Sequence, residues 1–299
     1  MQLPDDLNAT ITSLGLDPAF VVHMAHRALA EDLDGGVDVT TTALVPAAAV
    51  VHADFRMRVD GVVAGIVIAK VILLEACGGA VRFVDFMPDG ASAKAGEVIF
   101  TAIGPAQGLL TGERSALNFL GRLSGIATAT RAWSNVLAGS QTQVRDTRKT
   151  TPGLRAFEKF AVRMGGGVNH RMSLSDAAMI KDNHIVAAGS ISAAHLALKL
   201  RFPDVPVEIE IDSLSQLEEA VATGAELILL DNMTPEMCDL AVRQIAGRAK
   251  SEASGGITLE NARKYAEVGV DYIAVGALTH SVMNIDIGVD FRSEDAARN

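Results

Sequence analysis

The sequence predicts a mixed α/β protein with two parts, a small α+β domain followed by an α/β barrel. Three observations predict this fold. The chain has 299 residues, enough for one large or two ordinary domains. In roughly the first 110 residues, strand and helix patterns follow no regular order. After Ser140 they alternate at intervals of about 20 to 30 residues, which is typical of βα units around a parallel sheet.

The N-terminal part combines helical and extended patterns that are separated by turn signals such as Pro88-Asp89-Gly90. Its last pattern is a long helix that leads into the second part. In chain order the predicted elements are a helix over residues 20–29, strands over 50–59 and 62–68, a helix over 69–77, strands over 81–86 and 98–102, and a helix over 113–137.

The C-terminal part contains six short, mostly apolar runs that indicate strands. Helical patterns lie between the later runs, and one of them begins with Thr234 as N-cap and Pro235 in its first turn. Six strands with short connections favour a closed barrel over an open sheet. The predicted strands lie near residues 143–145, 178–180, 207–211, 227–230, 249–253 and 272–275.

The composition argues against several classes of protein. With 26 Lys and Arg, 36 Asp and Glu, a formal charge of −10 and one Trp, we expect no nucleic-acid binding. The apolar run 62–69 stops at Lys70 and is far shorter than the ~20 residues that span a bilayer, so we expect no membrane protein. Cys77 and Cys238 show no CxxC spacing, and the N-terminus is acidic where a signal peptide carries positive charge. We therefore expect a cytoplasmic protein without a disulfide framework or a cysteine zinc site.

Polar residues follow every predicted strand of the C-terminal part. In an α/β barrel the carboxyl ends of the strands build the active site, so these side chains should meet at one rim. Strand ends can also be polar simply because they reach solvent. This alternative explains a polar residue at one strand end equally well, but it explains polar residues at all six ends less well. In strand order the residues are Arg148 with Lys149, Lys181, Glu210, Asp231, Ser254 with Gly255 and Gly256, and Gly276 with His280.

Positive charge is concentrated between residues 145 and 181. This segment holds eight Lys and Arg against three acids, a balance of +5, while the other 262 residues hold 18 basic and 33 acidic groups, a balance of −15. We expect such a segment to build a pocket for an anion. His170 and Arg171 follow three glycines there, which let the backbone approach a ligand, and Arg binds carboxylates with two hydrogen bonds. A solvated basic loop is the simpler alternative.

Two further patterns indicate phosphate chemistry. The segment 254–256 ends a strand and precedes a helix, where backbone N–H groups and the helix dipole attract phosphate. Gly276 on the next strand supports this, because barrels often hold phosphate between their last two strands. Glu210 and Asp231 offer oxygen ligands for Mg²⁺ together with substrate phosphates. The sequence contains no GxSxG or GxGxxG, so nothing supports a hydrolase triad or a dinucleotide site.

Long strings of this sequence are specific enough to compare with known families. The central one is DTRKTTPGLRAFEKFAVRMGGGVNHRMSLSDAAMIKDNH, residues 146–184. The others are Glu31-Asp32 with Asp38-Val39-Thr40-Thr41, GERSALNFLGRLSGIATAT (112–130), VEIEIDSLSQLEEA (207–220), LILLDNM (227–233), SGGIT (254–258) and GVDYIAVGALTHS (269–281). Together they closely resemble the quinolinate phosphoribosyltransferase family, also called nicotinate-nucleotide pyrophosphorylase (carboxylating), over most of the chain.

The resemblance implies an N-terminal open-faced sandwich domain over residues 1–115 and an α/β barrel over 116–280, with residues 281–299 returning to the first domain. It implies a homodimer with active sites shared between subunits and leaves further assembly open. The implied enzyme is a pentosyltransferase that uses Mg²⁺ in NAD biosynthesis. It converts phosphoribosyl pyrophosphate and quinolinate to nicotinate mononucleotide, pyrophosphate and CO2.

The matched motifs also imply a role for each site residue. The residues that resemble the quinolinate clamp are Arg148, His170, Arg171 and Lys181, with Arg114 reaching in from the partner subunit. Those that resemble the catalytic set for phosphoribosyl pyrophosphate are Lys149, Glu210 and Asp231, of which Glu210 and Asp231 also resemble the metal ligands. Those that resemble the phosphate site are Lys149, Ser254, Gly255, Gly256, Gly276 and His280.

Three alternatives stay open. A related transferase of this fold would take nicotinate or another heterocyclic acid, although a monoacid needs fewer cations. A lyase or aldolase would use Lys181 or Lys149 to form a Schiff base, which borohydride trapping with a carbonyl substrate would reveal. A non-catalytic phosphosugar-binding protein would not need Glu210 and Asp231 together with Lys149.

Overall fold

The computed structural model describes residues 2–293. The chain divides into two compact units. The first unit comprises the residues up to 129, residues 156–165 and the residues from 282 onward, and the second comprises residues 130–155 and 166–281. The mixed α/β architecture with a separate N-terminal part is confirmed. The domain bounds at residues 115 and 280 stay a prediction.

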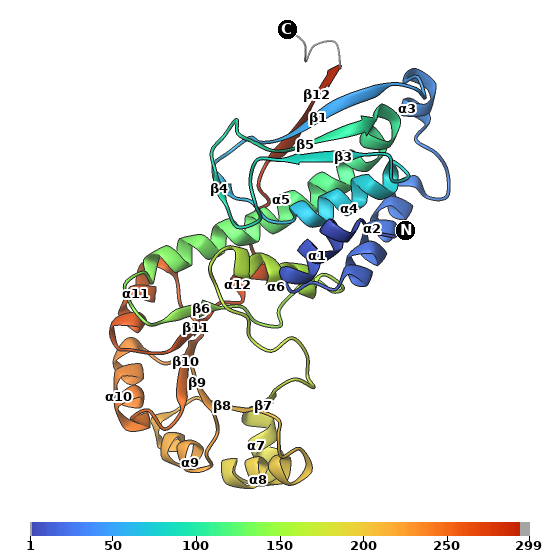
Figure 1. Ribbon diagram of the computed structural model, residues 1–299. Helices are drawn as coiled ribbons and strands as arrows, with labels where there is room; N and C mark the ends of the chain where they lie inside the picture. The colour runs from blue at the N-terminus through green and yellow to red at the C-terminus, as the bar shows by residue number, and fades with distance from the viewer. Residues whose placement is uncertain (1, 294–299) are drawn as a thin grey trace. The chain divides into compact units, whose positions relative to one another are not determined.

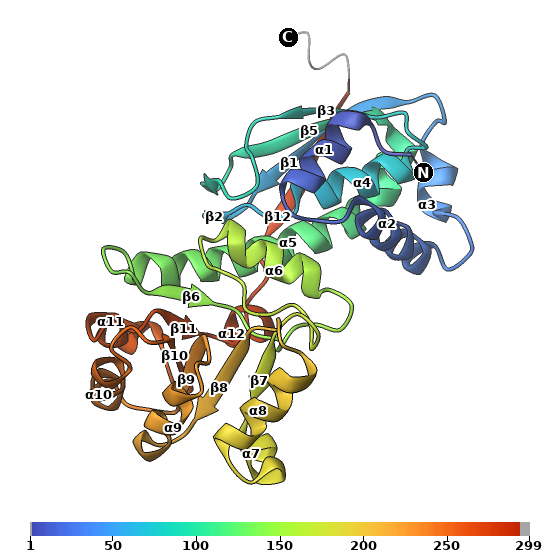
Figure 2. The ribbon, with the colours of Figure 1, turned by 60° about the horizontal axis from the view of Figure 1, so that its bottom comes forward.

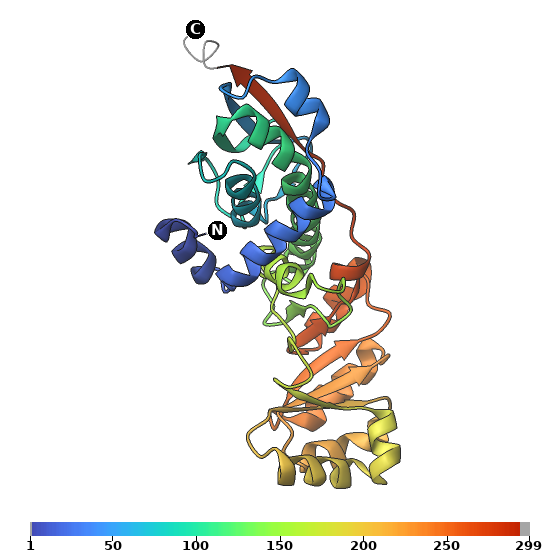
Figure 3. The same cartoon turned by 90° about the vertical axis from the view of Figure 1, so that its right-hand side faces the viewer.

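The first unit is built on a four-stranded antiparallel sheet in the order β12-β1-β5-β3. The red arrow of β12 lies along the blue strand β1 (Figures 1 and 3), so the end of the described chain completes the sheet that begins the fold. In chain order the elements are α1 (Asp5–Ser13), α2 (Pro18–Leu33), α3 (Val39–Leu44), β1 (Val50–Met57), β2 (Gly61–Val62), α4 (Ile66–Ala76), β3 (Arg82–Asp85), β4 (Ser92–Ala93), β5 (Val98–Pro105), α5 (Ala106–Val136, which continues into the second unit) and β12 (Ile287–Ser293).

Helix α4 corrects one prediction from the sequence. The sequence predicts a strand over residues 62–68, but this strand ends at Val62 and the run continues as α4. Because α4 is buried on all sides at most positions, its apolar run shows neither the helical nor the strand period. The carboxylate oxygen Oδ1 of Asp89 accepts hydrogen bonds from the backbone N–H groups of Gly65 (2.6 Å) and Ile66 (3.0 Å). These bonds satisfy donors at the start of the helix.

Helix α6 (Arg155–Met164) narrows a second prediction. Most of this helix belongs to the first unit, where the side chains of Phe157 and Lys159 are fully buried. Nη2 of Arg163 donates a hydrogen bond to the carbonyl oxygen of Leu14 at 2.6 Å. Two of the eight cations in the basic segment therefore stabilise the first unit. Only part of this segment therefore contributes cations to the expected pocket.

The second unit contains a parallel sheet of six strands in the order β6-β11-β10-β9-β8-β7. All six strands predicted in this half are confirmed. Figure 2 shows helices alternating with these strands along the chain, as βα units require. The elements are β6 (Gln143–Arg145), β7 (Ala178–Ile180), α7 (Asp182–Ala188), α8 (Ile191–Arg201), β8 (Val207–Ile211), η1 (Leu214–Gln216), α9 (Leu217–Ala222), β9 (Leu227–Asp231), α10 (Pro235–Ile245), β10 (Lys250–Ser254), α11 (Leu259–Glu267), β11 (Tyr272–Ala274) and α12 (Ala277–His280).

The two edges of this sheet are β6 and β7. Within residues 2–293, no strand ladder joins them, and a single parallel bridge links Arg145 of β6 to Val168. The parallel α/β core is confirmed, and it is consistent with the predicted barrel, whose closure stays a prediction. Because the strands are parallel, their carboxyl ends share one edge, where α/β proteins bind ligands. Among the helices of the described chain, none has both the length and the apolar character needed to cross a bilayer.

Candidate active site

A cavity of about 460 Å³ lies at the carboxyl ends of the strands in the second unit. Eight residues that the sequence singles out line it: Arg148, Lys149, His170, Arg171, Lys181, Glu210, Asp231 and Ser254. The cavity wall also contains five further residues: Thr147, Met179, Leu229, Glu252 and Ala274. Four predicted phosphate-binding residues lie outside this lining: Gly255, Gly256, Gly276 and His280.

The basic side of the cavity comes from the ends of two strands and the segment between them. Arg148 and Lys149 follow β6, Arg171 precedes β7, and Lys181 follows it. Burial, and then the charge of Arg148, lower the pKa of Arg171. Nε of Arg148 is buried and has no hydrogen-bond partner within residues 2–293. A guanidinium group whose charge is disfavoured by a second one beside it, together with an unused donor on that neighbour, indicates a site for an anion.

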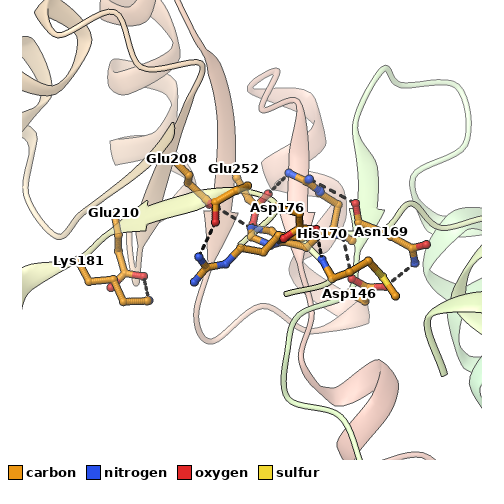
Figure 4. A network of polar contacts seen from close by, with 12 residues as sticks. Asp146, Asn169, His170, Asp176, Lys181, Glu208, Glu210 and Glu252 are labelled. Carbon is orange, nitrogen blue, oxygen red and sulfur yellow. Dashed lines mark hydrogen bonds and ion pairs between the residues drawn. The ribbon is translucent and has the colours of Figure 1, made fainter. Parts of the chain in front are cut away.

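The acidic side consists of Glu210 on β8 and Asp231 at the end of β9, two neighbouring strands. Nζ of Lys181 donates to Oε2 of Glu210 (Figure 4). Oδ2 of Asp231 accepts a hydrogen bond from Nδ2 of Asn232 at 2.7 Å. Two carboxylates that line one cavity provide the oxygen ligands that Mg²⁺ prefers, with water or phosphate completing its coordination. The residues present therefore fit this ion.

Two glycines allow close approach of the backbone next to these side chains. Gly255 has a φ of +89°, and a Cβ atom there would lie 2.1 Å from Oδ1 of Asn232. A Cβ atom at Gly276 would lie 3.0 Å from Cδ of Lys149 and 3.2 Å from Nε2 of His280. The structure thus brings Gly276, Lys149 and His280 together, three residues that the family resemblance relates to one phosphate.

A buried hydrogen-bond network adjoins the cavity (Figure 4). Nε2 of His170 lies 2.7 Å from Oε2 of Glu208, and the backbone N–H of Arg171 donates to Nδ1 of His170 at 2.8 Å. Because Nδ1 accepts a hydrogen bond, the ring proton resides on Nε2 and is donated to Glu208. Nη1 of Arg145 donates to Oε2 of Glu252 at 2.6 Å. The network thus engages both ring nitrogens of His170 within the protein.

Asp146 fixes the loop that carries His170. Its carboxylate is fully buried, and Oδ1 accepts a hydrogen bond from the backbone N–H of His170 at 2.8 Å. Oδ2 accepts a second one from Nδ2 of Asn169 at 2.5 Å. Since Asp146 directly follows β6, these bonds tie the loop that precedes Arg171 to the carboxyl end of an edge strand of the sheet.

Glu252 on β10 is an acid with a strongly perturbed pKa. Its side chain is fully buried, and burial, followed by the negative charge of Glu208, raises its pKa to about 7. The charge of Arg145 and its hydrogen bond to Glu252 offset part of this effect. Oε1 of Glu252 and Oε1 of Glu208 are both buried without a hydrogen-bond partner in the described chain. A carboxyl group that titrates near neutral pH at a cavity is typical of functional sites.

Comparison with known protein families identifies this arrangement. The family model for the quinolinate phosphoribosyl transferase C-terminal domain matches residues 126–290, and the model for its N-terminal domain matches residues 38–124. The chain belongs to the quinolinate phosphoribosyltransferase family. The resemblance found in the sequence is thereby confirmed.

Individual members of the family are similar over most of their length. Nicotinate-nucleotide pyrophosphorylase [carboxylating] of Mycobacterium leprae is 49% identical over 268 residues, which cover 88% of this chain and 94% of that protein. Quinolinate phosphoribosyltransferase [decarboxylating] 1 of Nicotiana glauca is 38% identical over 286 residues, and the match covers 89% of this chain and 81% of that protein. The crystal structure of NadC from Streptococcus pyogenes superposes with a TM-score of 0.89 at 38% identity, covering 93% of this chain and 98% of that one.

Two acids at the site of this quinolinate phosphoribosyltransferase family member were not predicted from the residues at the strand ends. Glu208 and Glu252 lie within strands β8 and β10 rather than after them. Glu208 precedes Glu210 by two residues, so both point to the same face of the sheet, and this alternation could have identified Glu208. The strand Lys-Ser-Glu-Ala-Ser around Glu252 has no apolar alternation that would mark its inner face.

Arg114 is the one predicted substrate contact that lies in the first unit. It is on helix α5, and its side chain is exposed. Its expected role, contact with quinolinate across a subunit interface of the family's dimer, stays a prediction.

Proposed function

We propose that this chain transfers the phosphoribosyl group of phosphoribosyl pyrophosphate to quinolinate with loss of CO2. The products are nicotinate mononucleotide, pyrophosphate and CO2, a step of NAD biosynthesis. One observation carries the proposal: a single cavity in a chain of this family is lined by four cationic side chains and, in the same wall, by the acids Glu210 and Asp231 at neighbouring strand ends. The six residues are Arg148, Lys149, Arg171, Lys181, Glu210 and Asp231.

The cationic side chains suit a diacid. Quinolinate carries two carboxylates on a pyridine ring, so it requires several fixed donors. Arg148, Arg171 and Lys181 supply them, and each hydrogen bond to a charged group contributes about 1.5–3 kcal/mol. The second carboxylate therefore contributes enough to select a diacid over a monoacid. His170 already uses both ring nitrogens within the protein, so we assign it the role of orienting the backbone at Arg171.

The carboxylates suit the transfer step. The ring nitrogen of quinolinate forms a bond to C1 of the ribose while the bond from C1 to pyrophosphate breaks, so positive charge develops on the sugar. Glu210 and Asp231 stabilise this charge electrostatically. The same two carboxylates would hold Mg²⁺, which would supply charge neutralisation for pyrophosphate. Lys149 shares the cavity with both acids and adds a positive charge for the phosphates.

The 5′-phosphate of the ribose fits the glycines at the ends of β10 and β11. We assign it to the backbone and side chains of Ser254, Gly255, Gly256, Gly276 and His280, together with Lys149. The absence of a Cβ at Gly255 and Gly276 keeps these backbone segments close to their neighbours. Backbone N–H groups in such turns bind phosphate without contributing side-chain bulk.

Loss of CO2 follows from the charge on the ring. After transfer, the pyridine nitrogen is quaternised and carries a positive charge. The bond between C2 and its carboxylate breaks, CO2 leaves, and the electron pair stays on C2 beside this positive nitrogen. A proton from solvent then forms the C–H bond of nicotinate mononucleotide.

We further infer a cytoplasmic homodimer in which Arg114 of each subunit completes the quinolinate site of the other. The acidic composition and the two buried free cysteines support the location. Subunit mixing tests the shared site: inactive Arg114→Ala and Lys181→Ala proteins should regain partial activity after exchange, because some mixed dimers contain one intact site. No recovery after verified exchange would contradict the shared site.

A product assay tests the proposed reaction. The protein is incubated with phosphoribosyl pyrophosphate and Mg²⁺, with quinolinate or nicotinate in parallel, and nicotinate mononucleotide is detected by mass spectrometry. We expect product only from quinolinate, with an equal amount of CO2. Product from nicotinate would indicate a related transferase for a monoacid, and product from neither would contradict the assignment.

A further inference from the structure

Glu252 is a cavity residue to which neither the transfer nor the decarboxylation assigns a role. It lines the cavity wall, yet its side chain is fully buried. Its oxygen Oε2 accepts the hydrogen bond from Arg145, while Oε1 has no hydrogen-bond partner within residues 2–293. A buried carboxylate oxygen that lacks a partner is costly, so the group is expected to be stable only in a neutral form or beside a cation.

Every element around Glu252 presents either one charged or titratable group or an apolar side chain. Arg145 comes from β6, Glu208 from β8, and His170 from the segment before β7, with its Nε2 at 3.7 Å from Oε1 of Glu252. On the two neighbouring strands, Leu229 and Tyr272 lie opposite Glu252. Glu210, two residues beyond Glu208, is engaged by Lys181.

The positions of the two buried acids indicate where a proton fits. One carboxylate oxygen of Glu208, one of Glu252 and a ring nitrogen of His170 lie within 4.8 Å of one another. Oε1 of Glu208 also lacks a partner in the described chain. A proton on Glu252 would let a single O–H···O hydrogen bond to Glu208 satisfy both oxygens after a small side-chain movement. The bond from Arg145 can remain in place.

We propose that Glu252 is a residue that determines affinity for quinolinate: it stays protonated when the substrate binds, so that the cavity wall carries no additional negative charge next to a dianion. The inference rests on the proposed function, because it concerns the binding of a diacid. If Glu252 ionises, its charge repels both carboxylates of the ligand and weakens the attraction from the arginines. Because the group titrates at about pH 7, this loss occurs near neutral pH.

Calorimetric titration of quinolinate into the full-length protein without phosphoribosyl pyrophosphate tests the inference. If ionised Glu252 weakens binding by about tenfold, the Kd should rise about sixfold from pH 6.5 to pH 8.5. Both carboxyl groups of quinolinate remain ionised over this range, so the ligand adds no slope. Glu252→Gln is neutral at every pH and can still donate to Glu208, so its Kd should stay constant within about twofold.

Two controls separate this role from a structural one. Glu267→Gln makes the same chemical change at an exposed site paired with Arg263, and it should keep the pH profile of the unaltered protein. In the unaltered protein, titration at pH 7.5 in buffers with different ionisation heats should show uptake of about half a proton upon binding. This second measurement needs no variant, so the test holds even if Glu252→Gln does not fold.

The outcomes distinguish the inference from the proposed function. Quinolinate binding that is equally tight from pH 6.5 to 8.5, without proton uptake, contradicts the role of Glu252 alone. A Glu252→Gln variant that keeps the slope of the unaltered protein contradicts it as well. No binding at pH 6.5, where Glu252 is mostly neutral, contradicts the proposed function itself.

Discussion

Asp54 in the first unit and Glu252 in the second are both buried carboxylates on strands, but their partners differ. Oδ1 of Asp54 accepts hydrogen bonds from Thr101 (2.6 Å) and from Nη2 of Arg292 (2.7 Å), and Oδ2 accepts one from Nε of Arg292 (2.7 Å). Glu252 receives a hydrogen bond from Arg145 on one oxygen, and its other oxygen has no hydrogen-bond partner among residues 2–293.

The pKa values of these two acids shift in opposite directions. Burial alone would raise the pKa of Asp54, but the hydrogen bonds from Arg292 and Thr101 outweigh it and the pKa falls. At Glu252, burial and the charge of a second acid prevail, and the pKa rises to about 7. A buried carboxylate whose two oxygens both accept hydrogen bonds, such as Asp54, stabilises the fold. We propose that one with an unsatisfied oxygen, such as Glu252, responds to a ligand.

Two lysine–acid pairs show the same contrast. In the first unit, Nζ of the buried Lys70 lies 2.5 Å from Oδ2 of Asp85. In the second, Lys181 pairs with Glu210, and both side chains line the cavity. The pair in the first unit should affect only stability, and the pair in the second should affect catalysis. Matched substitutions in the two pairs test whether this difference holds.

The largest effect is expected for Glu210→Gln. It removes a negative charge that faces the developing sugar cation and one ligand of the proposed Mg²⁺ site, so kcat should fall by about 1000-fold. Asp85→Asn is the matched change in the first unit and should leave kcat within about twofold. Steady-state rates at saturating substrates measure both. Equal losses in the two variants would mean that Glu210 acts through the fold.

The next effect is expected for Lys181→Met. Loss of a charge-assisted hydrogen bond should weaken quinolinate binding by about 100-fold, with a much smaller change for phosphoribosyl pyrophosphate. Lys70→Met should change the midpoint of thermal unfolding but not the Kd for quinolinate. Equal losses of affinity for both substrates in Lys181→Met would show that the cation belongs to a different subsite.

Residues at or near the carboxyl ends of strands could be predicted from the sequence, whereas Glu252 in the middle of β10 could not. Lys181, Glu210 and Asp231 line one cavity as expected, because parallel strands deliver their carboxyl ends to one edge. Glu252 lies within β10, where neighbouring residues do not reveal which side faces the cavity. Its importance depends on the distance to Glu208, a contact between strands that are far apart in the chain.

Charge counting along the sequence was only partly informative. Four of the eight cations in the basic segment line the cavity, but Lys159 is buried in the first unit and Arg163 bonds to backbone there. Local charge density cannot distinguish these cases. The chain passes from the second unit into the first at α6 and returns to the second after it, so cations that are close in sequence lie in different units. The continuous apolar run of α4 was misassigned for a related reason, since a fully buried helix has no amphipathic period.

A smaller effect is expected for Arg292→Ala. This variant leaves Asp54 buried with Thr101 as its remaining partner, so the free energy of unfolding should fall by about 2 kcal/mol, less than for a fully buried pair because Arg292 is partly exposed. The Kd for quinolinate should not change. Chemical denaturation and calorimetry measure the two quantities. A large loss of quinolinate affinity at unchanged stability would contradict the assignment of Asp54 to the fold.

The smallest effect concerns the pH dependence of stability. Because its pKa is raised, Glu252 makes a stabilising contribution to the free energy of unfolding that is present below about pH 4.5 and is lost as the pH rises toward 7. Because its pKa is lowered, Asp54 makes a stabilising contribution that is present above its unfolded pKa and is lost as the pH falls. Glu252→Gln should therefore flatten the decline of thermal stability between pH 5 and 7, by on the order of 1 kcal/mol. An unchanged profile would show that Glu252 is already ionised.

Binding of three acids tests the central claim, that the cations at the strand ends of the second unit form a site for a diacid. Quinolinate has carboxylates at the two adjacent ring positions C2 and C3 of pyridine. Picolinate has only the one at C2, and nicotinate only the one at C3. Calorimetric titration at pH 6.5 should give a Kd for quinolinate that is at least about 100-fold lower than for either monoacid. Equal affinities for the three acids would contradict the account.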